Sequence, residues 1–168
     1  KDAIAEGFDT IIAAVARRTR ASISDLADGI YEFEDVVDDD GLSRTNIKIK
    51  VKIIVTGEEI EFDFDGTDPQ VEGNTNVTFA GLQAACLYCM KVLLDPDCPQ
   101  NHGMLDPVTI KAPLGSIVNA AFPAASAARA ISSSVPKRRP ARWPWSSARS
   151  PKRDRRCGHA RSSSSPAT

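Results

Sequence analysis

Long apolar runs are missing from this chain. Nowhere do its apolar residues approach the roughly 18 in succession that a membrane-spanning helix needs. The first 20 residues also lack the uninterrupted apolar core of a signal peptide, because charged side chains break it repeatedly. These interruptions are Asp2, Glu6, Asp9, Arg17, Arg18 and Arg20. We therefore expect no membrane association and no secretory targeting signal in this sequence.

Cysteine is scarce, with 4 residues in 168. Without a secretory context, four cysteines do not indicate a disulfide framework, and we expect free thiols in a reducing cytoplasm. An initiator methionine is also missing, since the sequence opens at Lys1 directly in an amphipathic pattern. We expect the chain to be part of a larger protein.

Acidic residues are nearly absent from the C-terminal quarter. The chain has 21 Lys and Arg and 22 Asp and Glu, of which residues 126–168 hold 11 basic residues and one acid, Asp154. Residues 1–125 therefore keep 10 basic and 21 acidic residues. From about Ser134 the sequence is rich in Arg, Ser and Pro without an apolar period, so it cannot bury enough surface to offset its ordering entropy. We expect a folded region over 1–133 and a disordered basic tail over 134–168.

This tail allows three interpretations. Basic residues beside Trp143 and Trp145 would suit the phosphates and stacked bases of a nucleic acid, which would make the chain a non-enzymatic interaction module with a binding arm. A charge run is more often simply solvated. Abrupt Arg, Ser, Pro and Ala richness is also what a GC-rich gene yields when it is read out of frame. We favour the third interpretation and expect no nucleic-acid partner.

Alternating apolar and charged residues predict three strands, over residues 30–37, 46–56 and 59–65. Alternation gives each strand one wet face, which favours antiparallel pairing in a meander. The lysines of the middle strand would then lie between acidic faces, and each opposite-charge pair contributes roughly 0.2–1 kcal/mol. The expected buried face consists of Ile49, Val51, Ile53, Phe62 and Phe64.

Two helices are expected to pack on this sheet. Apolar residues at helical spacing from Ile4 to Val15 predict an amphipathic helix over about residues 2–20. Residues 77–94 predict a second helix that is apolar nearly all round, and therefore buried. Residues 108–112 predict a fourth strand. The fold class is α+β: an antiparallel β-meander packed with two helices.

The segment Asp63-Phe64-Asp65-Gly66-Thr67 matches the DxDGT signature of haloacid-dehalogenase-like phosphatases. In that family the first Asp is the nucleophile, the second a general acid/base, and Mg²⁺ is required. The motif belongs at the end of a buried parallel strand, which reads as a continuous apolar run. Here the preceding strand alternates, so the phosphatase is kept only as an alternative. A parallel strand reached by a crossover after Asp65 would favour it.

Cys86, Cys89, Cys98 and His102 have a spacing loosely like that of a zinc site. Cys86 and Cys89, however, lie three residues apart inside a helical pattern, and a buried free cysteine behaves as a small apolar residue. We favour packed thiols and a loop histidine over metal ligands.

A longer chain of motifs resembles the hydantoinase B/oxoprolinase family, which includes the B subunit of N-methylhydantoinase-type enzymes and relatives in acetone and acetophenone carboxylases. The resemblance covers about residues 10–133 and departs after Ile131-Ser132-Ser133, where the Arg/Ser/Pro-rich tail begins. The matching stretches are Arg17-Arg18-Thr19-Arg20-Ala21, Asp28-Gly29-Ile30-Tyr31, Asp38-Asp39-Asp40-Gly41, residues 62–71, Gly73-Asn74-Thr75-Asn76, Leu93-Leu94-Asp95-Pro96-Asp97, Asn101-His102-Gly103 and Ala112-Pro113-Leu114-Gly115-Ser116, continued by residues 119–125 and 128–130.

This resemblance implies an ATP-dependent amidohydrolase that opens cyclic amides such as a hydantoin or 5-oxoproline. It implies a partner, a hydantoinase A-like subunit that binds and spends ATP. The carboxylase branch of the family implies an ATP-dependent ketone carboxylase instead. Gly66, Gly73 and Gly81 are too far apart to line one nucleotide, so we expect the chain alone to be inactive.

The loop between the third strand and the second helix holds the candidate site residues. Asp65 and Asp68 are the candidate catalytic carboxylates, which could bind a divalent metal or orient a water. Thr67, Asn74 and Asn76 are candidate substrate-binding residues, whose polar groups could hold a ring amide. The alternative is that Asp65, Asp68 and Asn74 only stabilise turns through bonds from their side chains to the backbone.

Overall fold

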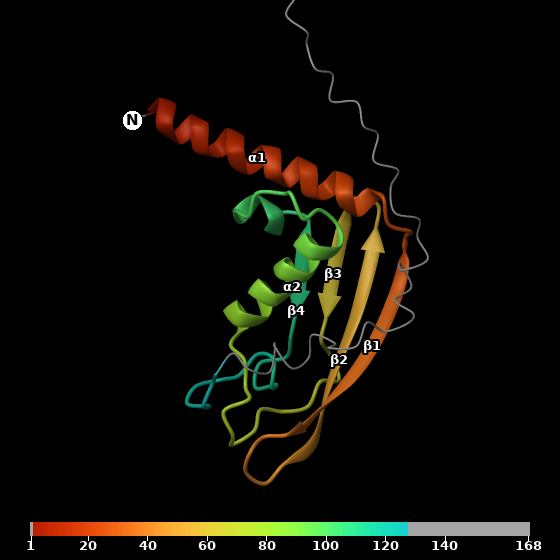
Figure 1. Cartoon of the computed structure of the whole chain (residues 1–168), viewed down its shortest axis with the longest axis vertical. Coiled ribbons are helices and arrows are strands. Elements are labelled where there is room, and N and C mark those ends of the chain that lie inside the picture. The colour runs from red at the N-terminus through yellow and green to blue at the C-terminus, as the bar shows by residue number, and fades with distance from the viewer. Residues whose placement is uncertain (1, 128–168) are drawn as a thin grey trace, which may run out of the picture.

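The structure, a computed structural model, describes residues 2–127. A four-stranded sheet carries α2 against one face, and α1 crosses one end of the sheet (Figure 1). The elements are α1 (Asp2–Ser24), β1 (Gly29–Asp39), β2 (Thr45–Thr56), β3 (Glu59–Asp63), α2 (Phe79–Leu93), the 3-10 helix η1 (His102–Leu105) and β4 (Val108–Lys111). The α+β class is confirmed. The expected disordered tail lies outside the described residues.

The sheet has the order β1-β2-β3-β4. β1 and β2 are antiparallel, as are β2 and β3, so the predicted meander is confirmed. β4 joins the sheet parallel to β3, after a crossover that contains α2 and η1, and the sheet is therefore mixed rather than antiparallel throughout. This connection returns the chain to the end of the sheet at which β3 began, which makes the next strand parallel.

Opposite charges face each other across the strands, as the alternation predicts. Lys52 lies directly opposite Glu32 on one side and Asp63 on the other. Its Nζ is 3.1 Å from the Asp63 carboxylate. Lys111 of β4 forms the equivalent pair with Glu61 of β3, at 2.8 Å. The polar face of the sheet is thus held by ion pairs that fix the register of its central strands.

The opposite face of the sheet forms the hydrophobic core. Ile49, Ile53, Phe62 and Phe64 are buried there, and Val51 is half-buried against them. Ile23 of α1 and three residues of α2, Leu82, Cys86 and Met90, complete this core. The predicted buried face is confirmed, because period-2 alternation commits one side of each strand to the core.

The two helices are both present, but each has an uncovered apolar surface. The C-terminal half of α1 is buried through residues such as Val15 and Ile23, whereas Ile4 and Phe8 are exposed. α2 packs one side on the sheet and leaves Tyr88 and Val92 exposed. The expectation of a helix buried all round therefore holds on one side only. Among residues 2–127, no helix is long and apolar enough to cross a membrane.

Candidate functional site

β2 is longer than β3, and the loop after β3 runs along the N-terminal part of β2 that β3 does not cover. Gly66 permits the necessary turn with a φ of 83°, in the left-handed region that favours glycine. Thr67 Oγ1 accepts from Lys50 N at 3.0 Å and donates to Lys50 O at 2.9 Å. Asp68 Oδ2 accepts from Lys48 N at 2.9 Å, and Asp68 N donates to Lys48 O. These two side chains replace the ladder partners that a longer β3 would have supplied.

Asp65 lies at the exposed tip of this loop. Its backbone N–H donates to the carboxylate of Asp63 at 3.0 Å. That bond holds the pKa of Asp63 below its usual range, and the ion pair with Lys52 adds a smaller effect in the same direction. Asp63 is therefore a paired carboxylate on the polar face of the sheet, while Asp65 projects from the loop.

The two asparagines occupy opposite environments. Asn76 is completely buried, and its Nδ2 donates to the carbonyls of Val71, Gly73 and Ala125 at 2.8–2.9 Å. Its Oδ1 accepts from Val71 N at 2.8 Å. The side chain of Asn74 is exposed, and the backbone carbonyl of this residue accepts from Ala127 N. Bonds to the backbone thus occupy the side chains of Thr67, Asp68 and Asn76, whereas Asp65 and Asn74 are exposed. Of the three residues in the turn-stabilising alternative, Asp68 makes such a bond.

Asp40, in the turn between β1 and β2, was missed as a site residue by the sequence reasoning. It is 3% exposed, and its Oδ1 accepts from the N–H groups of Leu42, Ser43 and Arg44 at 2.9–3.0 Å. These bonds lower the pKa of Asp40, and the bond from Arg44 N has the largest effect. Gly73 of the candidate loop packs directly against it, since a Cβ there would lie 2.1 Å from Asp40 O. In the sequence, the run of three Asp residues before Gly41 is the feature that could have pointed to Asp40.

Lowered carboxylate pKa values predict a loss of stability in acid. Because the fold favours the ionised form of Asp40, its contribution is fully present above the ordinary Asp pKa of about 4 and is lost as pH falls through the lower folded value. We expect Asp40→Asn to lower the melting temperature at pH 7 and to shrink the difference between melts at pH 7 and pH 3. An unchanged difference in this variant would show that other carboxylates dominate acid unfolding.

Unpaired buried polar atoms gather at this end of the sheet. Within residues 2–127, the buried side-chain oxygens or nitrogens that lack a hydrogen-bond partner are Asp40 Oδ2, Thr75 Oγ1 and Ser116 Oγ. They come from the turn between β1 and β2, from the candidate loop and from the segment after β4, which are joined by backbone bonds such as Ile117 N to Asp68 O at 3.0 Å. Such atoms are uncommon in folded proteins, and each is a place where a water or a polar ligand can complete the hydrogen bonding.

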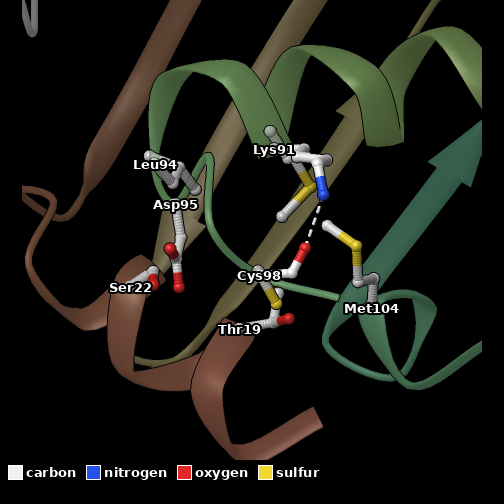
Figure 2. Close-up of a pocket in the computed structure, with 8 residues that line it drawn as sticks. Thr19, Ser22, Lys91, Leu94, Asp95, Cys98 and Met104 are labelled. Carbon is white, nitrogen blue, oxygen red and sulfur yellow. Dashed lines mark hydrogen bonds between the residues drawn. The ribbon is translucent and has the colours of Figure 1, made fainter. Parts of the chain in front are cut away.

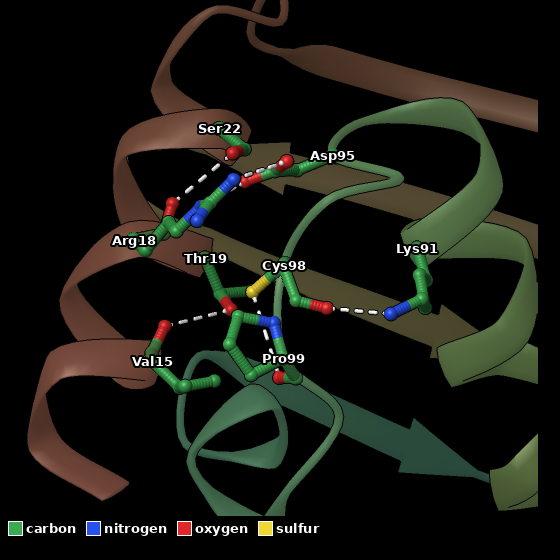
Figure 3. A network of polar contacts seen from close by, with 8 residues as sticks. All are labelled: Val15, Arg18, Thr19, Ser22, Lys91, Asp95, Cys98 and Pro99. Atoms are coloured by element: carbon green, nitrogen blue, oxygen red, sulfur yellow. Dashed lines mark hydrogen bonds and ion pairs between the residues drawn. The ribbon is translucent and has the colours of Figure 1, made fainter. Parts of the chain in front are cut away.

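A second cluster of polar contacts lies at the other end of the sheet, where α1, α2 and η1 meet (Figure 1). Arg18 forms a two-point ion pair with Asp95, and Lys91 Nζ donates to Cys98 O at 2.6 Å (Figure 3). A small pocket beside these contacts is lined by Thr19, Ser22, Met90, Lys91, Leu94, Asp95, Cys98 and Met104 (Figure 2). Three of the motif stretches thus meet here, and their contacts join α1 to the end of α2.

Of the cysteines within residues 2–127, Cys86 and Cys98 are buried and Cys89 is half-buried. Cys86 lies in the core, where burial raises the pKa of its thiol to about 12 and keeps it protonated. Cys98 is buried between α1 and η1, and His102 is exposed at the start of η1. In the described part of the chain, no three His, Cys, Asp or Glu residues are grouped so that they could hold a metal ion.

One feature required by the phosphatase alternative is present, since β4 is parallel to β3 and follows a crossover. The remaining context is different. β3 is a five-residue strand with half-buried polar positions, and Asp63 is held by Lys52 on its polar face. The nucleophile of that alternative would therefore be engaged in an ion pair between two strands.

A similar fold also occurs in a solved enzyme. The crystal structure of the ATP-dependent caprolactamase from Pseudomonas jessenii superposes with a TM-score of 0.63 at 21% identity, over 76% of this chain and 22% of that chain. The family model for hydantoinase B/oxoprolinase matches residues 1–136. The chain belongs to the hydantoinase B/oxoprolinase family, as its motifs predict.

Two curated relatives show how much of a family protein the chain represents. The 5-oxoprolinase of Saccharomyces cerevisiae is 46% identical over 89 residues, which are 53% of this chain and 7% of the relative. A protein of Pseudomonas sp. (strain NS671), assigned as the B subunit of a D-/L-hydantoinase, is 32% identical over 141 residues, covering 73% of this chain and 24% of the relative. The chain thus spans about a quarter or less of the length of these relatives.

Proposed function

We propose that the chain forms part of the B-type subunit of an ATP-dependent enzyme that opens cyclic amides. The observation that carries this proposal is the convergence of family motifs at one end of the sheet. The loop of residues 64–76 meets the turn at Asp40 and the segment at Ser116 there, and the unpaired buried polar atoms lie in these same segments. Relatives named as a 5-oxoprolinase, the B subunit of a hydantoinase and a caprolactamase act on ring amides.

Each candidate residue has a distinct part in this proposal. Asp65 and Asn74 reach the surface of the loop, where a carboxylate could hold a divalent metal or a water and an amide could bind a ring carbonyl. Thr67, Asp68 and Asn76 act as positioning residues, because their bonds to Lys50, Lys48 and Val71 fix the path of the loop. ATP would be bound and hydrolysed by a separate hydantoinase A-like subunit.

The test is a two-variant comparison in the complex of a family-length B-type subunit carrying this loop with its ATP-binding partner. We expect Asp65→Asn to lower the turnover of a cyclic amide by about 100-fold, since general acid-base groups typically contribute 10²–10⁴-fold. Asn74→Ala should lower it by about tenfold, since a lost hydrogen bond costs about 1 kcal/mol. Both side chains are exposed, so the melting temperature should stay within about a degree, as surface changes cost under roughly 0.5 kcal/mol. Ring opening is followed by the product carboxylate, together with ATP consumption.

The matched control is Asp68→Ala, a half-buried neighbour that holds Lys48 N. It should lower the melting temperature, because the orphaned N–H costs about 1–3 kcal/mol. Normal turnover in both surface variants would remove the loop from the active site. If the complex instead fixes bicarbonate onto a ketone and leaves cyclic amides intact, the carboxylase branch is correct.

A further inference from the structure

The outward side of α2 is apolar and uncovered among residues 2–127. Tyr88 and Val92 each follow a buried residue, Cys86 and Met90, by two positions. At 3.6 residues per turn this places them on the side of the helix opposite the core, and they are 58% and 50% exposed. The single charged residue of α2, Lys91, is bonded to the carbonyl of Cys98. A helix at the surface of a domain normally carries charged residues on its outward side, and α2 carries none there.

The N-terminal half of α1 shows the same property. Ile4 and Phe8 are 67% and 63% exposed. They lie four residues apart on a stripe that continues into Val15, which is buried. Glu6 lies two positions from both Ile4 and Phe8, on the opposite side of the helix, and Asp9 flanks the stripe without interrupting it. The same apolar stripe is therefore covered in the C-terminal half of α1 and bare in the N-terminal half, which extends past η1 (Figure 1).

We propose that these two surfaces, Tyr88 and Val92 on α2 with Ile4 and Phe8 on α1, pack inside a family-length subunit against polypeptide outside the region matched here. The stripe on α1 is continuous with the hydrophobic core. The relatives are four or more times longer than the part that matches this chain, so they contain enough polypeptide to cover both helices. This inference rests on family membership and is independent of the catalytic proposal.

Cysteine labelling tests the proposal at single positions. Tyr88→Cys and Phe8→Cys are prepared in the isolated chain and in a chimera, in which residues 4–127 replace the matching segment of the Pseudomonas hydantoinase relative. Maleimide labelling is followed peptide by peptide by mass spectrometry. Both cysteines should react rapidly in the isolated chain and about 100-fold or more slowly in the chimera, because a core position reacts only after local opening. Thr10→Cys, on the far side of α1, should react rapidly in both.

Three results would overturn the proposal. Rapid labelling of Tyr88→Cys and Phe8→Cys in the chimera would show that the surfaces stay exposed in the longer subunit. Protection that appears in the isolated chain and rises with its concentration would show that a second copy covers them. If Thr10→Cys were protected to the same degree in the chimera, the whole of α1 would be buried and not only its apolar surface. If the chimera does not accumulate, the cysteines are placed at the aligned positions of the Pseudomonas relative itself, and the same rates are compared with those of the isolated chain.

Discussion

Replacing Gly103 by alanine is expected to lower the melting temperature by about 10 °C or more. A Cβ at this position would lie 2.2 Å from Ile12 O and 3.0 Å from Ala16 N, both backbone atoms of α1. Backbone cannot rotate away as a side chain can, so α1 must move off η1 and lose the contacts of Val15 and Met104. Overpacking costs typically 1–3 kcal/mol and sometimes more, and about 3 kcal/mol moves the midpoint of a domain this size by roughly 10 °C.

The matched control is Gly7→Ala in α1, the helix that Gly103 of η1 approaches. No atom lies within 4 Å of a Cβ at Gly7, and alanine is favoured over glycine inside a helix by about 1 kcal/mol. This variant should therefore melt at the same temperature as the parent chain or slightly above it. Circular dichroism melts of both variants settle the comparison. If Gly103→Ala melts like the parent, the close approach of α1 to η1 does not hold in solution.

Asn76→Ala is expected to cost the second-largest loss of stability, about 3 kcal/mol. The side chain is completely buried and makes four bonds, which join Val71, Gly73 and Ala125 to one point. Removing it leaves Val71 N and three carbonyls without this partner, and each unsatisfied buried group costs about 1–3 kcal/mol. Because Ala125 lies 49 residues away in sequence, the loss should also loosen the segment of residues 120–127 from the candidate loop.

Asn74→Ala provides the comparison for this experiment, since it is two residues away and exposed. Its free energy of unfolding should change by less than about 0.5 kcal/mol. Urea unfolding of the two variants measures the difference directly. If both variants lost the same free energy of unfolding, Asn76 would not hold the loop more than Asn74 does. The proposed roles of the two asparagines would then be wrong.

Local pattern in the sequence was sufficient for the strands of the meander and for the position of both helices. The alternation of Ile49, Val51 and Ile53 with lysines places one face inward whatever the partner strand is, because successive side chains of a strand point to opposite sides. The same alternation predicted the pairing of Lys52 with acids on either side, confirmed opposite Glu32 and Asp63. Motif order was likewise sufficient to indicate the family, which the comparisons confirm.

Other features were decided only by the tertiary structure. The residues Val108–Lys111 predict a strand but carry no signal for the neighbour they join, and the crossover through α2 makes that pairing parallel. An asparagine in a polar loop can bind a ligand or the backbone, and its direction depends on distant segments such as the one at Ala125 that holds Asn76. Asp40 is brought to the candidate loop by the close packing of Gly73 against it, a contact between residues 33 positions apart. Periodicity records which side of an element is apolar, whereas three-dimensional contacts determine what covers that side and which polar atoms remain free.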